Sequence, residues 1–146
     1  MKKTIAIASD HAGYQMKLKI ISHLEEKGFN VEDLGTSSGE SVDYPDYGHP
    51  LAEAVEKGSY IAGISICGSG NGINMVTNKH QGIRGALCWN KEITLLARKH
   101  NNANICSLPA RFIDMDMARE LVDIFLSTPY EGGRHQRRIG KIPLQT

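Results

Sequence analysis

The chain has 146 residues, with 17 Lys and Arg against 16 Asp and Glu, so its formal net charge is +1. At roughly 100–200 residues per domain, this length predicts one domain spanning residues 1–146. The near-neutral charge gives no reason to expect nucleic acid as a partner. No apolar run approaches the ~18 residues of a membrane span, so we expect no membrane partner either.

The cysteine content predicts the cellular compartment. Three cysteines occur, Cys67, Cys88 and Cys106, and none lies in a C-x-x-C spacing. This argues against a disulfide scaffold or a zinc knuckle and favours a reducing compartment. The apolar residues after Lys3 form too short a run for a secretion signal. We therefore expect a cytoplasmic protein.

The first half of the chain predicts two strands around one helix. A buried strand at residues 4–9 precedes the helix, and a weaker strand at residues 30–34 follows its Lys27-Gly28 stop signal. The connection over residues 35–48 is rich in Ser, Gly and Asp, and loops of that length are often functional. The apolar stripe of the helix consists of Tyr14, Leu18, Ile21 and Leu24.

The second half predicts three more strands with helices between and after them. The strands are short apolar runs at residues 61–67, 83–88 and 104–108, typical of parallel strands buried on both faces. The helical stripes are Ile93, Leu96, Ala97 and His100, then Ala118, Leu121, Val122 and Phe125.

Strands that alternate with helices indicate right-handed crossovers and a parallel sheet covered on both faces. We therefore predict an α/β fold of three layers, α/β/α, in the Rossmann or flavodoxin-like manner. The expected strand order is 2-1-3-4-5. A basic helical tail should follow at the C-terminus, where four basic residues fall within residues 134–138.

The predicted topology brings two distant stretches to one site. In open α/β sheets, ligands bind at the carboxyl ends of the strands where the strand order reverses. That point lies between the first and third strands. Asp10-His11 follows the first strand, and Cys67 with a glycine-rich turn follows the third. These two stretches should therefore converge.

The glycine-rich turn allows two interpretations. Gly68, Gly70 and Gly72 do not match a dinucleotide fingerprint, because Ile73 stands where its third glycine belongs. A P-loop lysine and a nucleophile elbow are also missing. The turn is either a cradle of backbone N–H groups for an oxyanion or only a tight strand-to-helix connection. Alone, the pattern decides neither.

Cys67 also has two interpretations. A helix start stabilises a thiolate, which would make Cys67 a base or a nucleophile. The alternative is a small buried hydrophobic residue, the role we assign to Cys88 and Cys106. The position of Cys67 at the start of a predicted helix favours the functional interpretation.

The histidines are ambiguous as well. His100 ends a predicted helix, where it is either functional or stabilised by the helix dipole. His11 beside Asp10 is either a site residue or part of a strand-end cap. No ligand spacing for a metal such as H-E-x-x-H occurs, so we expect no metal.

The basic tail has three interpretations. It could be a solvated face or a nucleic-acid patch, although the tail lacks the interleaved aromatic residues of the latter. The third is phosphate capture by Arg134 and Arg138, which share one face if the segment is helical. The pattern alone leaves these interpretations open.

Six sequence blocks in order carry a family resemblance across nearly the whole chain. They are Ser9 to Gly13, Asp43 to Pro45, Cys67 to Gly72, Asn78-Lys79 with Gly82 to Arg84, His100-Asn101, and Tyr130 to His135. Together they resemble the family of ribose-5-phosphate isomerase type B, which it shares with isomerases of galactose 6-phosphate and allose 6-phosphate.

The resemblance implies residue roles. Cys67 would be the base that moves a proton between C1 and C2, because Ile73 replaces the glutamate that serves in another branch. His100 would open the furanose ring, and Arg134 and Arg138 would bind the phosphate. The other residues implied in substrate binding are Asp10, His11, Tyr44, Gly68, Ser69, Gly70, Asn71, Gly72, Asn101 and Arg111.

The resemblance implies an aldose–ketose isomerase that interconverts D-ribose 5-phosphate and D-ribulose 5-phosphate in the pentose phosphate pathway. The reaction would pass through a cis-enediol intermediate and would need no cofactor or metal. The family also implies a homodimer, or a dimer of dimers, with a shared active site.

One alternative is a six-carbon substrate, allose 6-phosphate or galactose 6-phosphate. Galactose 6-phosphate isomerase works as two different subunits, whereas Cys67 and His100 in one chain favour a homomer. The other alternative is a non-catalytic module that binds a phosphorylated metabolite tightly and never turns it over.

Overall fold

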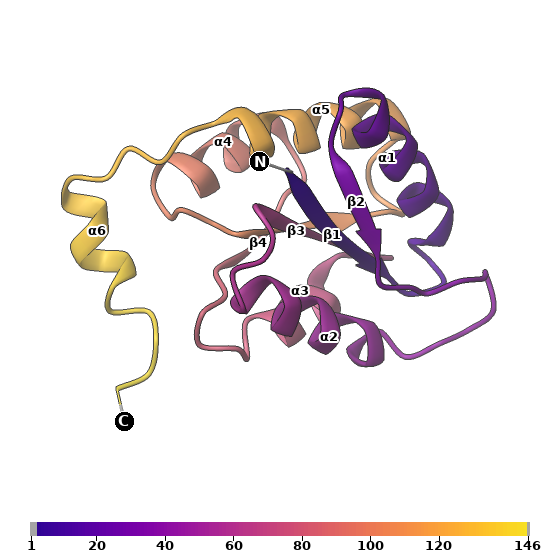
Figure 1. Cartoon of the computed structure of the whole chain (residues 1–146), viewed down its shortest axis with the longest axis horizontal. Helices are drawn as coiled ribbons and strands as arrows, with labels where there is room; N and C mark the ends of the chain where they lie inside the picture. The colour runs from indigo at the N-terminus through magenta and orange to yellow at the C-terminus, as the bar shows by residue number, and fades with distance from the viewer. Residues whose placement is uncertain (1–2, 146) are drawn as a thin grey trace.

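The computed structural model describes residues 3–145, in which strands and helices alternate along most of the chain (Figure 1). No helix in this range is both long and apolar enough to cross a membrane. The elements in chain order are β1 (Thr4–Ser9), α1 (Tyr14–Glu26), β2 (Asn30–Asp33), α2 (Pro45–Glu56), β3 (Ala62–Cys67), α3 (Asn71–Thr77), β4 (Gly85–Leu87), α4 (Lys91–Lys99), β5 (Ile105–Pro109), α5 (Met115–Ser127) and α6 (Arg134–Ile139).

The strands form one parallel sheet in the order β2-β1-β3-β5-β4. Figure 1 shows α1, α4 and α5 on one face and α2 and α3 on the other. Alternate residues of the strands feed two apolar cores, one beneath each helical layer. The fold is thus the three-layer α/β/α, Rossmann-like arrangement expected from the sequence.

The order of the last two strands differs from the predicted 2-1-3-4-5, because β5 lies between β3 and β4. All five residues of β5 are buried, whereas the three residues of β4 are only half-buried. The strand that is buried on both faces takes the inner position, and the short strand takes the edge. α3 and α4 lie on opposite faces, as right-handed crossovers require when the chain direction across the sheet reverses.

The helical stripe predicted for α5 is confirmed, since Ala118, Leu121, Val122 and Phe125 are all buried. The stripe predicted for α1 is only partly confirmed: Leu24 is buried and Ile21 packs against the core. Its buried apolar residues are Met16, Ile20 and Leu24, and Leu18 is exposed. The face is rotated because Lys17 also turns inward, toward the end of β2.

The connection after β2 is shorter than predicted, because α2 already begins at Pro45. Proline is favoured in the first helical turn, where its missing N–H has no partner to lose. Gly48 then allows α2 to approach α3 closely, since a Cβ there would lie 2.9 Å from Val76 Cγ1. The first turn of α2 therefore holds the end of this connection against α3.

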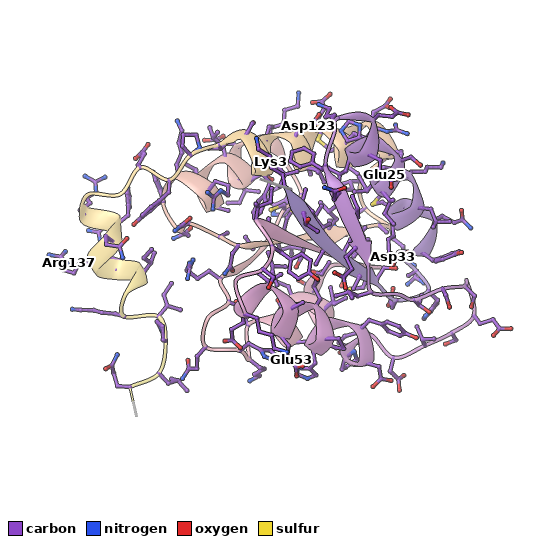
Figure 2. All side chains as sticks on the ribbon, viewed as in Figure 1. Lys3, Glu25, Asp33, Glu53, Asp123 and Arg137 are labelled. Atoms are coloured by element: carbon purple, nitrogen blue, oxygen red, sulfur yellow. The ribbon has the colours of Figure 1, made fainter. Side chains whose placement is uncertain are left out.

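A buried ion pair fixes the other end of the same connection. The Lys17 side chain is 0% exposed, and its Nζ lies 2.6 Å from both carboxylate oxygens of Asp33. Asp33 Oδ1 also accepts a hydrogen bond from the Gly35 N–H at 2.9 Å. Asp33 thus ties the end of β2 to α1 and to the start of the connection (Figure 2).

We expect the substitution Asp33→Asn to lower the free energy of unfolding by about 3 kcal/mol, because it leaves the Lys17 ammonium buried and unpaired. Breaking a buried ion pair usually costs about 3–5 kcal/mol, and we expect the lower end because Asp33 is 40% exposed. The double variant Lys17→Met, Asp33→Asn should recover most of the loss, as measured by urea titration.

The control is Asp123→Asn, which removes a partly exposed partner of His23 and Lys27. It should lower the free energy of unfolding by about 0–1 kcal/mol in the same urea titration. Equal losses for Asp33→Asn and Asp123→Asn would contradict the buried pair.

Candidate active site

A cavity of about 520 Å³ opens at the carboxyl ends of β1, β3 and β5. It joins the turn after β1 to the glycine-rich turn after β3, as the reversal of strand order predicts. Ala12 and Phe112 also line it; the sequence named neither as a site residue, although Ala12 lies within the block Ser9 to Gly13. The lining residues are Asp10, His11, Ala12, Tyr44, Cys67, Gly68, Ser69, Gly72, Arg111 and Phe112.

Cys67 is the last residue of β3 and contributes a thiol to this cavity. It is only 4% exposed, and it pairs with Pro109 of the neighbouring β5. Its carbonyl oxygen accepts a hydrogen bond from the Ala110 N–H at 2.9 Å. The neighbouring strand β5 and the residue after it thus hold the backbone that carries the thiol.

The other two cysteines lie in the interior, as predicted. Cys88 and Cys106 are both completely buried. A hydrogen bond with Cys88, together with burial, raises the pKa of the Cys106 thiol well above its ordinary value. Neither lines the cavity, which leaves Cys67 as its thiol.

The turn after Cys67 depends on Gly70. Its φ of +74° is left-handed, a conformation that glycine adopts without the cost of a Cβ. A Cβ there would also lie 2.5 Å from Leu87 Cδ1. The chain can therefore reverse sharply into α3, and Asn71 begins that helix with its N–H groups toward the turn.

Two further glycines make room for side chains that reach over the turn. A Cβ on Gly68 would meet Arg111 Nη1 at 3.0 Å, and one on Gly72 would meet Tyr44 Cζ at 2.6 Å. The Arg111 N–H also donates to the Gly68 carbonyl oxygen at 3.0 Å. Arg111 therefore places a positive charge beside the backbone N–H groups, an arrangement suited to an anionic oxygen.

Hydrogen bonds to the backbone orient the side chains of Asp10 and His11, the two residues after β1. Asp10 is buried and accepts a hydrogen bond on Oδ1 from the Gly13 N–H at 3.1 Å. The Val42 N–H donates to His11 Nδ1 at 3.2 Å. This contact leaves Nε2 to carry the proton of the neutral imidazole, so His11 can donate a hydrogen bond into the cavity. Asp10 thus serves as the predicted cap and also lines the cavity.

Four of the predicted site residues lie elsewhere: His100, Asn101, Arg134 and Arg138. His100 caps the C-terminus of α4, at the edge of the sheet where β3 and β5 begin. The length of β5, about 13 Å at roughly 3.3 Å per residue, separates that edge from Cys67. One copy of the chain does not bring the two groups of residues together.

The second group forms its own cluster around α6, which stands apart from the body of the sheet (Figure 1). The imidazoles of His100 and His135 stack with centroids 4.3 Å apart and planes 17° apart. Arg134 and Arg138 are exposed on α6, and Arg137 points outward from it (Figure 2). The basic tail is therefore helical, as predicted, and its arginines reach no acidic partner within residues 3–145.

An apolar hollow continues the cavity along the surface. Its volume is about 340 Å³, and it shares Ser69 and Phe112 with the cavity. Phe112 is 75% exposed, and Trp89, which also lines the hollow, is half-exposed. Large aromatic side chains gathered in this way are typical of an interaction surface.

Comparison with known proteins identifies the family. The ribose/galactose isomerase family matches residues 5–142. The ribose-5-phosphate isomerase B of Escherichia coli is 42% identical over 140 residues, covering 96% of this chain and 94% of the relative. A crystal structure of a ribose 5-phosphate isomerase from Thermotoga maritima superposes with a TM-score of 0.95 at 49% identity, covering 98% of this chain and 99% of that one.

A second structure is ribose-5-phosphate isomerase B from Mycoplasma genitalium with bound ribulose-5-phosphate. It has a TM-score of 0.93 at 44% identity and covers 97% of this chain and 95% of that chain. The chain described here is therefore an isomerase with a three-layer α/β/α fold. It belongs to the ribose/galactose isomerase family.

Proposed function

We propose that the chain interconverts D-ribose 5-phosphate and D-ribulose 5-phosphate through a cis-enediol intermediate. The observation that carries this proposal is the Cys67 thiol in the cavity, directly before a turn of backbone N–H groups that Arg111 covers. The bound ribulose-5-phosphate of the Mycoplasma genitalium relative supports the choice of substrate.

In the proposed reaction the Cys67 thiolate removes the proton from C2 of the open-chain aldose and returns it to C1, while the hydroxyl proton on O2 passes to O1. A positioned base contributes about 10²–10⁴ in rate. Negative charge builds on the carbonyl oxygen as the enediolate forms, and the N–H groups from Gly68 to Gly72 would hold that oxygen. Each such donor is worth roughly 10²–10³ in kcat by comparison with other oxyanion holes.

We further propose that the site is shared within a homodimer, or a dimer of dimers. His100 is proposed to transfer the proton that opens the furanose ring, yet it lies the length of β5 away from Cys67 in the same chain. A second copy seated on the apolar hollow beside Phe112 would bring its own His100 and Asn101 to the cavity. The exposed aromatic residues of this hollow support that arrangement.

In this assembly Arg134 and Arg138 would bind the substrate phosphate. Arg138→Ala should raise KM by about 10- to 100-fold with little change in kcat, because a charge-assisted hydrogen bond is worth about 1.5–3 kcal/mol. Arg137→Ala is the matched control, since its side chain points away from the rest of the chain (Figure 2). Steady-state kinetics of both variants give KM and kcat. An unchanged KM for Arg138→Ala would show that Arg138 does not bind the phosphate.

The direct test follows ribose 5-phosphate by NMR with the purified protein, with and without EDTA. Ribulose 5-phosphate in both tubes is the expected result. No conversion would contradict the proposal and direct the same assay to allose 6-phosphate and galactose 6-phosphate. If those also stay unchanged, a protein that binds a phosphorylated metabolite without turnover is the remaining alternative.

Two wider expectations accompany the proposed function. We propose that residues 1–146 act as a single sugar-phosphate isomerase domain. We also propose the cytoplasm as its location, which the three unpaired cysteines support, because a reducing compartment keeps thiols free.

A further inference from the structure

Two imidazoles and one carboxylate meet where α4, the segment before α6, and α6 itself come together. His100 caps α4, Glu131 lies in the segment between α5 and α6, and His135 lies in the first turn of α6. One ligand atom from each of these side chains lies within 4.8 Å of the other two. His135 Nε2 also lies 3.5 Å from Glu131 Oε1.

The backbone holds this cluster in place before any ligand arrives. The Glu131 N–H donates to the Lys99 carbonyl oxygen at 3.1 Å, which ties the segment before α6 to the end of α4. His135 is only 8% exposed, and the imidazole of His100 stacks against it. Glu131 is exposed, so a small ion can reach the cluster from solvent.

We propose that His100, Glu131 and His135 bind a divalent transition metal of the Zn²⁺ class. Two imidazoles and a carboxylate are a common three-ligand set for zinc, with a fourth position left open. Imidazole ligands favour such metals over Mg²⁺ and Ca²⁺, which prefer oxygen. At Zn–N and Zn–O distances of about 2.1 Å, tetrahedral ligand atoms lie roughly 3.4 Å apart. The cluster must therefore contract, and at least one imidazole must rotate so that its nitrogen faces the metal.

This rotation gives the metal site a consequence for catalysis. A bound metal takes a ring nitrogen of His100 and breaks the stack with His135. It therefore removes the group assigned to ring opening, and the enzyme is inhibited. The inhibition rests on the proposed function of His100, whereas the metal site itself does not.

The metal site is tested by titrating the full-length protein with Co²⁺ and Zn²⁺. Co²⁺ binding is followed by its visible absorption, and Zn²⁺ binding by competition with Co²⁺. The titration is repeated in Cys67→Ala, because a thiol also binds these metals.

We expect Cys67→Ala to bind the metals with the affinity of the parent protein. Glu131→Gln should bind them at least roughly 10-fold more weakly, since even a change outside the ligand shell lowers metal affinity by about 10–100-fold. Circular dichroism confirms that each variant is folded.

A matched control is the surface pair in which His49 Nδ1 lies 2.8 Å from His80 Nε2. His49→Asn should leave the titration unchanged. Loss of binding in His49→Asn or in Cys67→Ala, or unchanged binding in Glu131→Gln, would overturn the proposed site.

The activity readout separates this proposal from the function of His100. Zn²⁺ should inhibit isomerisation in the parent protein, and Glu131→Gln should require at least 10-fold more Zn²⁺ for the same inhibition. Tight binding at the cluster without inhibition would support the metal site and contradict the role of His100 in the reaction.

Discussion

Replacing Cys67 with alanine is expected to abolish isomerisation while phosphosugar binding stays nearly intact. The thiol is the proposed base, and a positioned base contributes about 10²–10⁴ in rate. Cys67 is buried at the end of β3, and the groups proposed to hold the substrate come from other residues. kcat should therefore fall by that factor, with the dissociation constant for ribose 5-phosphate measured by calorimetry almost unchanged.

Cys88→Ala is the matched control for this experiment, because it removes a buried thiol that lies outside the cavity. It should retain kcat. Cys67→Ala with more than a few per cent of the parent kcat would show that Cys67 is not the base.

Mixing two inactive variants is expected to restore activity. Cys67→Ala and His100→Asn each remove one proposed group from every site of a homodimer. A mixed dimer contains one site that lacks both groups and one site that has both. Random pairing makes half of the dimers mixed, so co-refolded equal amounts should show roughly a quarter of the parent activity.

A second mixture controls for refolding and tests the same geometry. It combines parent protein with a double variant that carries both changes in one chain. Each mixed dimer in that case has two sites that lack one group each. Activity should then follow the parent homodimers alone, also roughly a quarter. No recovery in the first mixture would contradict a site shared between two copies.

The sequence predicted the convergence at the cavity because that prediction depends only on strand connectivity. Asp10 follows β1 and Cys67 ends β3, and parallel strands that flank a reversal present their carboxyl ends to one crevice. The strand order further along was wrong, because apolar pattern and length only weakly separate an inner strand from an edge strand. In the structure β5, which is buried on both faces, takes the inner position that was predicted for β4, and β4 lies at the edge.

The stripe of α1 was only partly confirmed for a related reason. Sequence periodicity treats a lysine as exposed, whereas Lys17 is completely buried and pairs with Asp33 on β2. That partner lies 16 positions further along the chain, outside any helical window. Likewise, Phe112 lines the cavity only because it follows the end of β5.

Local chemistry along the chain was enough to establish the layered α/β fold, the glycine-rich turn at a helix start and the family resemblance. These features depend on residues close in sequence or on motifs preserved in order. Only the tertiary structure separated Cys67 from His100 and joined His100 to Glu131 and His135. The physical reason is that these distances are set by strand length and by the path of the chain from α5 to α6, and no pattern of neighbouring residues encodes either.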